Sequence, residues 1–146
     1  MKLAIGNDHA GPEMKFELAE YLESKGHEVI NFGTDTTESV DYPDIAVKVA
    51  DAVLSGEAEK GVLICGTGIG ISLAANKING IRAACVSEPV SASLAVRHNN
   101  ANIICFGARI VDVETAKEIL DAFFGSEFEG GRHQRRVDKI MALEKR

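Results

Sequence analysis

Residues 61–70 read Gly61-Val62-Leu63-Ile64-Cys65-Gly66-Thr67-Gly68-Ile69-Gly70, an apolar run that leads into a glycine-rich turn. The run at 61–65 is apolar at every position, which is typical of a strand buried on both faces of a parallel sheet. After the turn, the sequence predicts a helix that continues to about residue 77. A strand, a short turn and a helix in succession form the unit from which α/β folds are built.

The same alternation continues on both sides of this segment, with short apolar runs between amphipathic stretches of helical length. We expect strands at residues 2–6, 29–30, 61–65, 82–86 and 102–106. We expect helices at residues 12–25, 43–54, from the glycine turn to 77, at 89–98, after Asp112 as N-cap to 124, and at 134–144. The pattern predicts one domain over residues 1–146, an α/β three-layer sandwich with a five-stranded parallel sheet. The expected strand order is 2-1-3-4-5, which is common for five strands.

Composition excludes several classes of protein. The chain has 146 residues, 45% of them hydrophobic, and 22 acidic against 16 basic side chains give a net charge of −6. An acidic protein with two tyrosines and no tryptophan lacks the basic surface and stacking platforms of a nucleic-acid-binding protein. No apolar run approaches the roughly 20 residues of a membrane-spanning helix, and we see no signal-peptide core. We therefore expect a cytoplasmic protein that binds neither nucleic acid nor membranes.

The basic charge is concentrated at the C-terminus. Residues 131–146, the predicted helical tail, carry six basic and two acidic side chains, a net charge of +4. This tail is either a solvated basic helix or a segment whose arginines hold an anion.

Two turns carry most of the side chains suited to chemistry. In the expected strand order, the turns at 6–11 and 65–70 face one another at the carboxyl edge of the sheet, where α/β proteins bind ligands. The first turn contains Asp8 and His9, and the second contains Cys65, Thr67 and backbone N–H groups at a helix N-terminus. Each of these side chains also has a simpler interpretation. Asp8 could cap its own turn, His9 could be a solvated side chain, and Cys65 could be the last core residue of its strand. The helix N-terminus favours a thiolate, and therefore a reactive Cys65.

The other cysteines and histidines are interpreted more simply. The three cysteines have no CxxC spacing, so we expect neither disulfides nor structural zinc. Cys85 and Cys105 lie inside predicted strands and are expected in the core. His27 is expected between a helix and a strand, and His133 on the surface.

His98 ends the predicted helix at 89–98, which runs back toward the opposite edge of the sheet. About ten residues at 1.5 Å each carry His98 about 15 Å from the edge that holds Cys65. If His98 is catalytic, we expect it to serve a second subunit.

Taken together, the motifs resemble one known family. They are Asn7-Asp8-His9-Ala10-Gly11, Asp41-Tyr42-Pro43-Asp44, Ile64 to Ser72, Ala74-Ala75-Asn76-Lys77, Gly80-Ile81-Arg82-Ala83, Arg97-His98-Asn99 and Glu129 to Val137. Their order along nearly the whole chain resembles the type B ribose-5-phosphate isomerases, a family that includes allose- and galactose-6-phosphate isomerases.

The resemblance implies an aldose–ketose isomerase with a flavodoxin-like fold that uses no metal and no cofactor. It also implies an assembly of at least two subunits, a dimer or a tetramer. It implies that ribose 5-phosphate and ribulose 5-phosphate interconvert through an enediolate, which needs a base, oxyanion donors, a ring-opening group and a phosphate clamp. The family match assigns the proton transfer to Cys65 with Thr67 and ring opening to His98. It further assigns the anion hole to Gly66, Thr67, Gly68, Ile69 and Gly70, the sugar hydroxyls to Asp8 and Asn99, and the substrate's phosphate and remaining contacts to His9, Arg109, Arg132 and Arg136.

Two other functions remain open at this point. One is an isomerase of six-carbon substrates, allose 6-phosphate or galactose 6-phosphate. The other is a non-catalytic phosphate- or flavin-binding module, which the glycine turn alone would also fit. The GxGxG spacing departs from the GxGxxG pattern of dinucleotide sites, so a pyrophosphate ligand is disfavoured.

Overall fold

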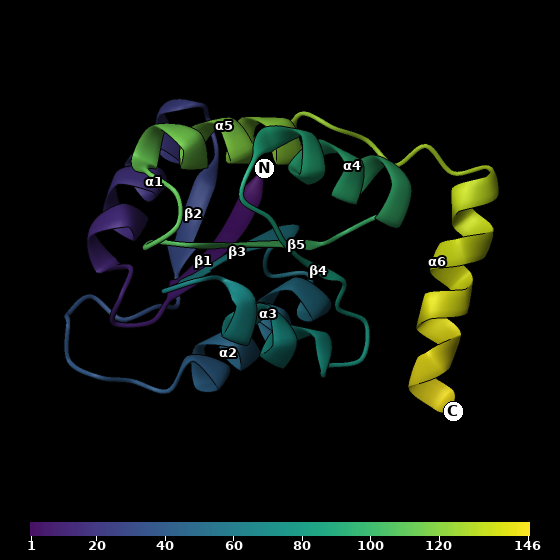
Figure 1. The fold of residues 1–146 in the computed structure, drawn as a ribbon, viewed down its shortest axis with the longest axis horizontal. Coiled ribbons are helices and arrows are strands. Elements are labelled where there is room, and N and C mark those ends of the chain that lie inside the picture. The colour runs from purple at the N-terminus through teal and green to yellow at the C-terminus, as the bar shows by residue number, and fades with distance from the viewer.

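A computed structural model describes all residues, 1–146, and shows a sheet covered by helices on both faces (Figure 1). The strands are β1 (Lys2–Asn7), β2 (Glu28–Asn31), β3 (Lys60–Cys65), β4 (Ala83–Cys85) and β5 (Ile103–Gly107). The helices are α1 (Pro12–Ser24), α2 (Tyr42–Ser55), α3 (Ile69–Asn76), α4 (Pro89–Asn99), α5 (Val113–Phe124) and α6 (Arg132–Ala142), followed by a short 3₁₀ turn, η1 (Leu143–Lys145). Helices α1, α4 and α5 cover one face, α2 and α3 the other (Figure 1). The predicted α/β sandwich with a five-stranded parallel sheet is confirmed.

The order of the last two strands was predicted wrongly. The sheet runs β2-β1-β3-β5-β4, so β5 lies beside β3 and β4 forms the edge. All five residues of β5 are buried, and the strand pairs with β3 on one side and with the three residues of β4 on the other. Ala83 and Ala84 are half-buried and Cys85 is exposed, as expected for a strand at the edge of the sheet. A strand rich in large apolar residues gains more from two neighbours than the short Ala-Ala-Cys strand does.

Local sequence signals explain where several helices begin. Pro12 lies in the first turn of α1, where its missing N–H costs nothing. The predicted N-cap of α5 is confirmed, since the Asp112 carboxylate accepts a hydrogen bond from the Thr115 N–H at 2.8 Å. No helix in the structure is long and apolar enough to cross a membrane.

The sheet separates two apolar clusters. One contains Phe106 and Phe123 and lies under α1, α4 and α5. The other lies under α2 and α3 and includes both Cys65 and Cys105. Cys105 is fully buried as predicted, and burial raises the pKa of its thiol well above the ordinary value. The prediction for Cys85 was wrong, because its place on the edge strand leaves it exposed.

A buried lysine holds the long loop that follows β2. Lys15, on α1, is 1% exposed, and its Nζ donates to the carbonyl of Thr34 at 2.8 Å and forms an ion pair with Asp35. The amide of Asn7, at the end of β1, also donates to the Thr34 carbonyl, at 3.0 Å. The hydrogen bond from Lys15 lowers the pKa of Asp35 below its ordinary value. The loop at 33–41 is thus fastened to the carboxyl end of β1.

The paired positions of Cys85 and Cys105 in neighbouring strands allow a matched test. We predict that Cys105→Ala lowers the free energy of unfolding by about 1 kcal/mol or more, because it leaves a void in the core. Cys85→Ala should change it by less than about 0.5 kcal/mol, as expected for a surface substitution. Urea denaturation of both variants measures the difference, and equal losses would contradict the assignment of β4 to the exposed edge.

The ion pair of Lys15 predicts a pH-dependent contribution to stability. Because the folded-state pKa of Asp35 is lowered, its stabilising effect is complete above the ordinary value of 3.8 and is lost as the pH falls through the lower folded-state value. Asp35→Asn should therefore lower the urea midpoint at pH 7, and the difference in midpoint between the variant and the wild type should disappear at acidic pH. Glu38→Gln, in the same exposed loop, is the control. A gap that stays constant from pH 7 to acid would refute the contribution of this carboxylate.

Candidate active site

Cys65 is the last residue of β3, and its side chain meets the turn that follows. The residue is 4% exposed, and the N–H of Gly68 donates to its sulfur at 3.1 Å. Such a hydrogen bond is stronger to a thiolate than to a thiol, because the acceptor then carries a full charge. The start of α3 thus provides a backbone donor for a negative charge on this sulfur.

The turn between Cys65 and α3 rests on a neighbouring strand. Gly68 has φ of +82°, and a Cβ at this position would lie 2.7 Å from the backbone of Phe106 in β5. A Cβ on Gly70 would lie 2.6 Å from the ring of Tyr42. Thr67 is exposed at the tip of the turn, where its hydroxyl oxygen accepts the N–H of Ile69 at 3.2 Å. Glycines therefore allow a close fit that fixes the turn and presents Thr67 to solvent.

Asp8 and His9 lie beside this turn. The N–H of Asp8 donates to the carbonyl of Ile64 at 3.1 Å, which places Asp8 next to the end of β3. The buried Asp8 carboxylate accepts the N–H of Ala10 at 2.9 Å, so it does cap its own turn. His9 Nδ1 accepts the N–H of Val40 at 3.2 Å. A neutral ring that accepts at Nδ1 carries its proton on Nε2, where it is a donor.

Arg109 joins the group from the segment after β5. Its N–H donates to the carbonyl of Gly66 at 3.0 Å, and its guanidinium lies 3.1 Å from the position that a Cβ of Gly66 would occupy. The structure therefore brings nine predicted site residues together at the carboxyl ends of the strands: Asp8, His9, Cys65, Gly66, Thr67, Gly68, Ile69, Gly70 and Arg109. We call this set the thiol half-site.

His98, Asn99, Arg132 and Arg136 lie elsewhere, at the end of α4 and on α6. Asn102, three residues after α4, accepts the N–H of Gly61 at 3.0 Å, so the end of α4 lies at the amino end of β3. Cys65 is four residues further along β3, about 13 Å away at 3.3 Å per residue. We call these four residues the imidazole half-site. Within one chain the two half-sites therefore lie at opposite ends of the strands, the thiol half-site at the carboxyl ends and the imidazole half-site at the amino ends.

His98 has two close polar neighbours. Its ring stacks on that of His133 with centroids 4.2 Å apart and planes 9° apart. Glu129 Oε1 lies 3.8 Å from His98 Nε2 and 3.7 Å from His133 Nε2, while its Oε2 accepts Arg97 Nε at 2.6 Å. The expectation of a surface position for His133 was wrong, because the residue is 8% exposed. Desolvation lowers the pKa of His133, and the hydrogen bond from Arg97 lowers that of Glu129.

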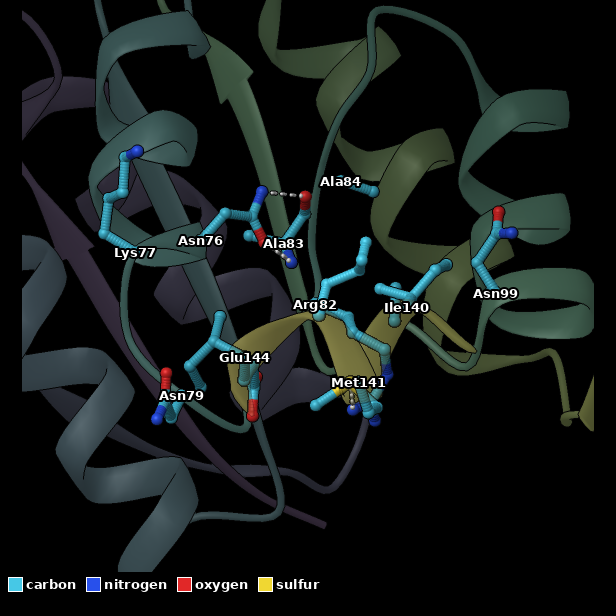
Figure 2. Close-up of a pocket in the computed structure, with 13 residues that line it drawn as sticks. Asn76, Lys77, Asn79, Arg82, Ala83, Ala84, Asn99, Ile140, Met141 and Glu144 are labelled. Atoms are coloured by element: carbon cyan, nitrogen blue, oxygen red, sulfur yellow. Dashed lines mark hydrogen bonds between the residues drawn. The ribbon is translucent and has the colours of Figure 1, made fainter. Parts of the chain in front are cut away.

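The arginines of the tail are carried by a helix that lies to one side of the sheet (Figure 1). Arg132 and Arg136 are exposed and four residues apart, so they can face the same way, while His133 and Val137 are the buried residues of α6. Figure 2 shows a pocket between α6 and the start of β4, in which the Arg82 guanidinium donates to Met141 Sδ at 3.3 Å. Residues of the tail line one side of this pocket, and Asn99 is the one predicted site residue among its lining residues.

Some residues at the two half-sites were not singled out from the sequence. Tyr42 packs against Gly70, and the Asp41-Tyr42-Pro43-Asp44 motif was the available signal. Lys15 fixes the loop whose Val40 contacts His9, and its position on the buried face of α1 with Leu18 and Leu22 could have indicated this. No sequence pattern pointed to the contact of Glu129 with His98, because these residues meet only through folding.

Comparison with known proteins gives a consistent result. Residues 3–140 match the family model described as Ribose/Galactose Isomerase. The chain is 52% identical to ribose-5-phosphate isomerase B of Escherichia coli K12 over 99% of this chain and 97% of that protein. It is similar to the structure of Clostridium thermocellum ribose-5-phosphate isomerase B, with a TM-score of 0.98 and 52% identity, covering 99% and 98% of the two chains. It also matches the Mycoplasma genitalium enzyme with bound ribulose 5-phosphate, with a TM-score of 0.94 and 42% identity over 99% and 96% of the chains.

The family model covers nearly the whole chain, and the relatives align over nearly their full lengths. The chain therefore belongs to the ribose/galactose isomerase family.

Proposed function

We propose that this protein interconverts ribose 5-phosphate and ribulose 5-phosphate through an enediolate, with Cys65 as the base. As a member of its family it is a sugar-phosphate isomerase. The observation that carries the proposal is the Cys65 thiol at the end of β3, which accepts the N–H of Gly68, while its chain neighbours Ile64 and Gly66 accept the N–H groups of Asp8 and Arg109. Ribose 5-phosphate is favoured over a six-carbon substrate because two relatives at 52% identity are ribose-5-phosphate isomerases B.

The chemistry requires a proton to move between C1 and C2 of the open-chain sugar. The Cys65 thiolate removes the proton from one carbon and the thiol returns it to the other, and Thr67 assists from the exposed tip of the turn. The negative charge that develops on oxygen is stabilised by the N–H groups of residues 66–70. No metal ion or organic cofactor takes part in this scheme.

The remaining residues bind the substrate and open its ring. His98 transfers the proton that opens the furanose, and Asp8 and Asn99 hold sugar hydroxyls. His9, through its Nε2 proton, contacts the phosphate together with Arg132 and Arg136, while Arg109 provides a further cationic contact beside the turn. The planar guanidinium of arginine suits the phosphate because it donates two parallel hydrogen bonds.

Because the two half-sites lie at opposite ends of the strands within one chain, we further propose a homodimer with two shared active sites. The thiol half-site of one subunit would be completed by His98 of the partner subunit. Large apolar side chains exposed near the thiol half-site support a contact there: Ile69, Leu73, Val90 and Ile110. The dimers could pair further into a tetramer. The three free cysteines agree with the reducing cytoplasm as the location.

The role of Cys65 predicts a specific kinetic defect. Cys65→Ala should abolish turnover, seen as a loss of kcat, while inhibition by inorganic phosphate stays close to that of the wild type, because only the proton-transferring group is removed. Cys85→Ala, which removes an exposed thiol, is the matched control and should keep near-normal turnover. A Cys65→Ala variant that retained most of the wild-type kcat would exclude Cys65 as the base. If the wild type itself showed no turnover, the result would favour a binding module.

The shared site predicts that two inactive variants complement each other. Cys65→Ala and His98→Ala proteins are mixed in equal amounts under conditions that exchange subunits. Each mixed dimer then has one site with both lesions and one with neither, so random exchange should restore about a quarter of the wild-type activity. If every site lay within one chain, each would keep a lesion. Subunit exchange confirmed by native mass spectrometry, with no activity recovered, would rule out shared sites.

A further inference from the structure

Three potential metal ligands meet where α4, the segment before α6 and α6 itself come together. They belong to His98, Glu129 and His133, and one ligand atom from each of these residues lies within 4.8 Å of the other two. The function proposed above uses His98 but gives no role to Glu129 or His133. Two imidazoles and one carboxylate form a ligand set that zinc binds in proteins, with the fourth position open to water.

The distances between Glu129 and the two imidazoles allow one zinc ion to bind between them. Glu129 Oε1 lies 3.8 Å and 3.7 Å from the two Nε2 atoms. Two atoms at this separation, each about 2.1 Å from an ion, subtend an angle of about 125° at it, so the ligands need to approach one another by a few tenths of an ångström to reach tetrahedral geometry. Because the two rings are stacked, one of them has to turn to aim both lone pairs at a common ion. The His98 side chain is 36% exposed and has room to turn, whereas that of His133 is 10% exposed and is held in place.

The charged groups around the cluster orient one ligand and limit the affinity of the site. Arg97 binds the other carboxylate oxygen of Glu129 and thereby orients Oε1 toward the rings. The nearby cations Arg97, Arg132 and Arg136 oppose a bound cation, so the site should be weaker than a structural zinc site.

We propose that His98, Glu129 and His133 bind a divalent transition metal ion of the zinc type. Such an ion would occupy the imidazole that is proposed to open the sugar ring, and it would therefore inhibit the enzyme in competition with the sugar phosphate. This consequence, unlike the site itself, depends on the proposed function.

Equilibrium dialysis with Zn²⁺ and titration with Co²⁺ test the site without reference to activity. The wild type should bind one ion per chain at this site, with the visible absorption of four-coordinate Co²⁺ and without the intense near-ultraviolet band of a thiolate ligand. Glu129→Gln and His133→Asn should each weaken binding by about tenfold or more. Glu127→Gln and His27→Gln, which change the same residue types outside the cluster, should bind as the wild type does.

Equal affinity in the wild type and in Glu129→Gln would overturn the proposal, and so would a Co²⁺ spectrum dominated by a thiolate. Because Glu129 is exposed, this variant tests the site even if His133→Asn does not fold. A separate assay follows isomerase activity with added Zn²⁺, each variant being compared with its own metal-free rate. Inhibition of the wild type that ribose 5-phosphate relieves supports competition. Binding without inhibition supports the site and contradicts the role proposed for His98.

Discussion

The contact between Gly68 and the backbone of Phe106 organises the thiol half-site. The turn after β3 can lie this close to β5 only because residue 68 has no side chain and adopts a positive φ. The same turn directs the Gly68 N–H to the Cys65 sulfur. The neighbouring position of β5 also brings Arg109, which follows it, onto Gly66. In the order 2-1-3-4-5, β4 would separate β5 from β3 and these contacts could not form.

Much of the fold could be predicted from local patterns, because each strand and helix has its own periodicity and its own end signals. Pro12 and Asp112 mark helix starts in the sequence and do so in the structure. The order of β4 and β5 could not be obtained in this way, because an apolar run shows that a strand is buried without showing which strand lies beside it. The error at Cys85 has the same cause, since its exposure follows from the place of β4 at the edge.

The residues of the candidate site likewise fall into those that local patterns predicted and those that they could not predict. Asp8, Cys65 and Thr67 were found because strand ends in a parallel sheet meet at one edge, and the direction of α4 placed His98 away from them. His133 and Lys15 depend on packing between distant segments, and their polar side chains gave no reason to expect burial. Lys15 is buried because a carbonyl and a carboxylate from the loop at 33–41 satisfy its ammonium group, and no pattern within α1 reveals such partners.

The two outer strands have a consequence for behaviour at high protein concentration. The edge strand β2 has four residues and the edge strand β4 has three, so each edge of the sheet offers few unpaired backbone groups to another molecule. Strand addition between molecules, the usual route to fibrils, would gain little from such short templates. Concentrated solutions of this protein should therefore resist amyloid-like aggregation, and self-association is left to side chains on helices and turns.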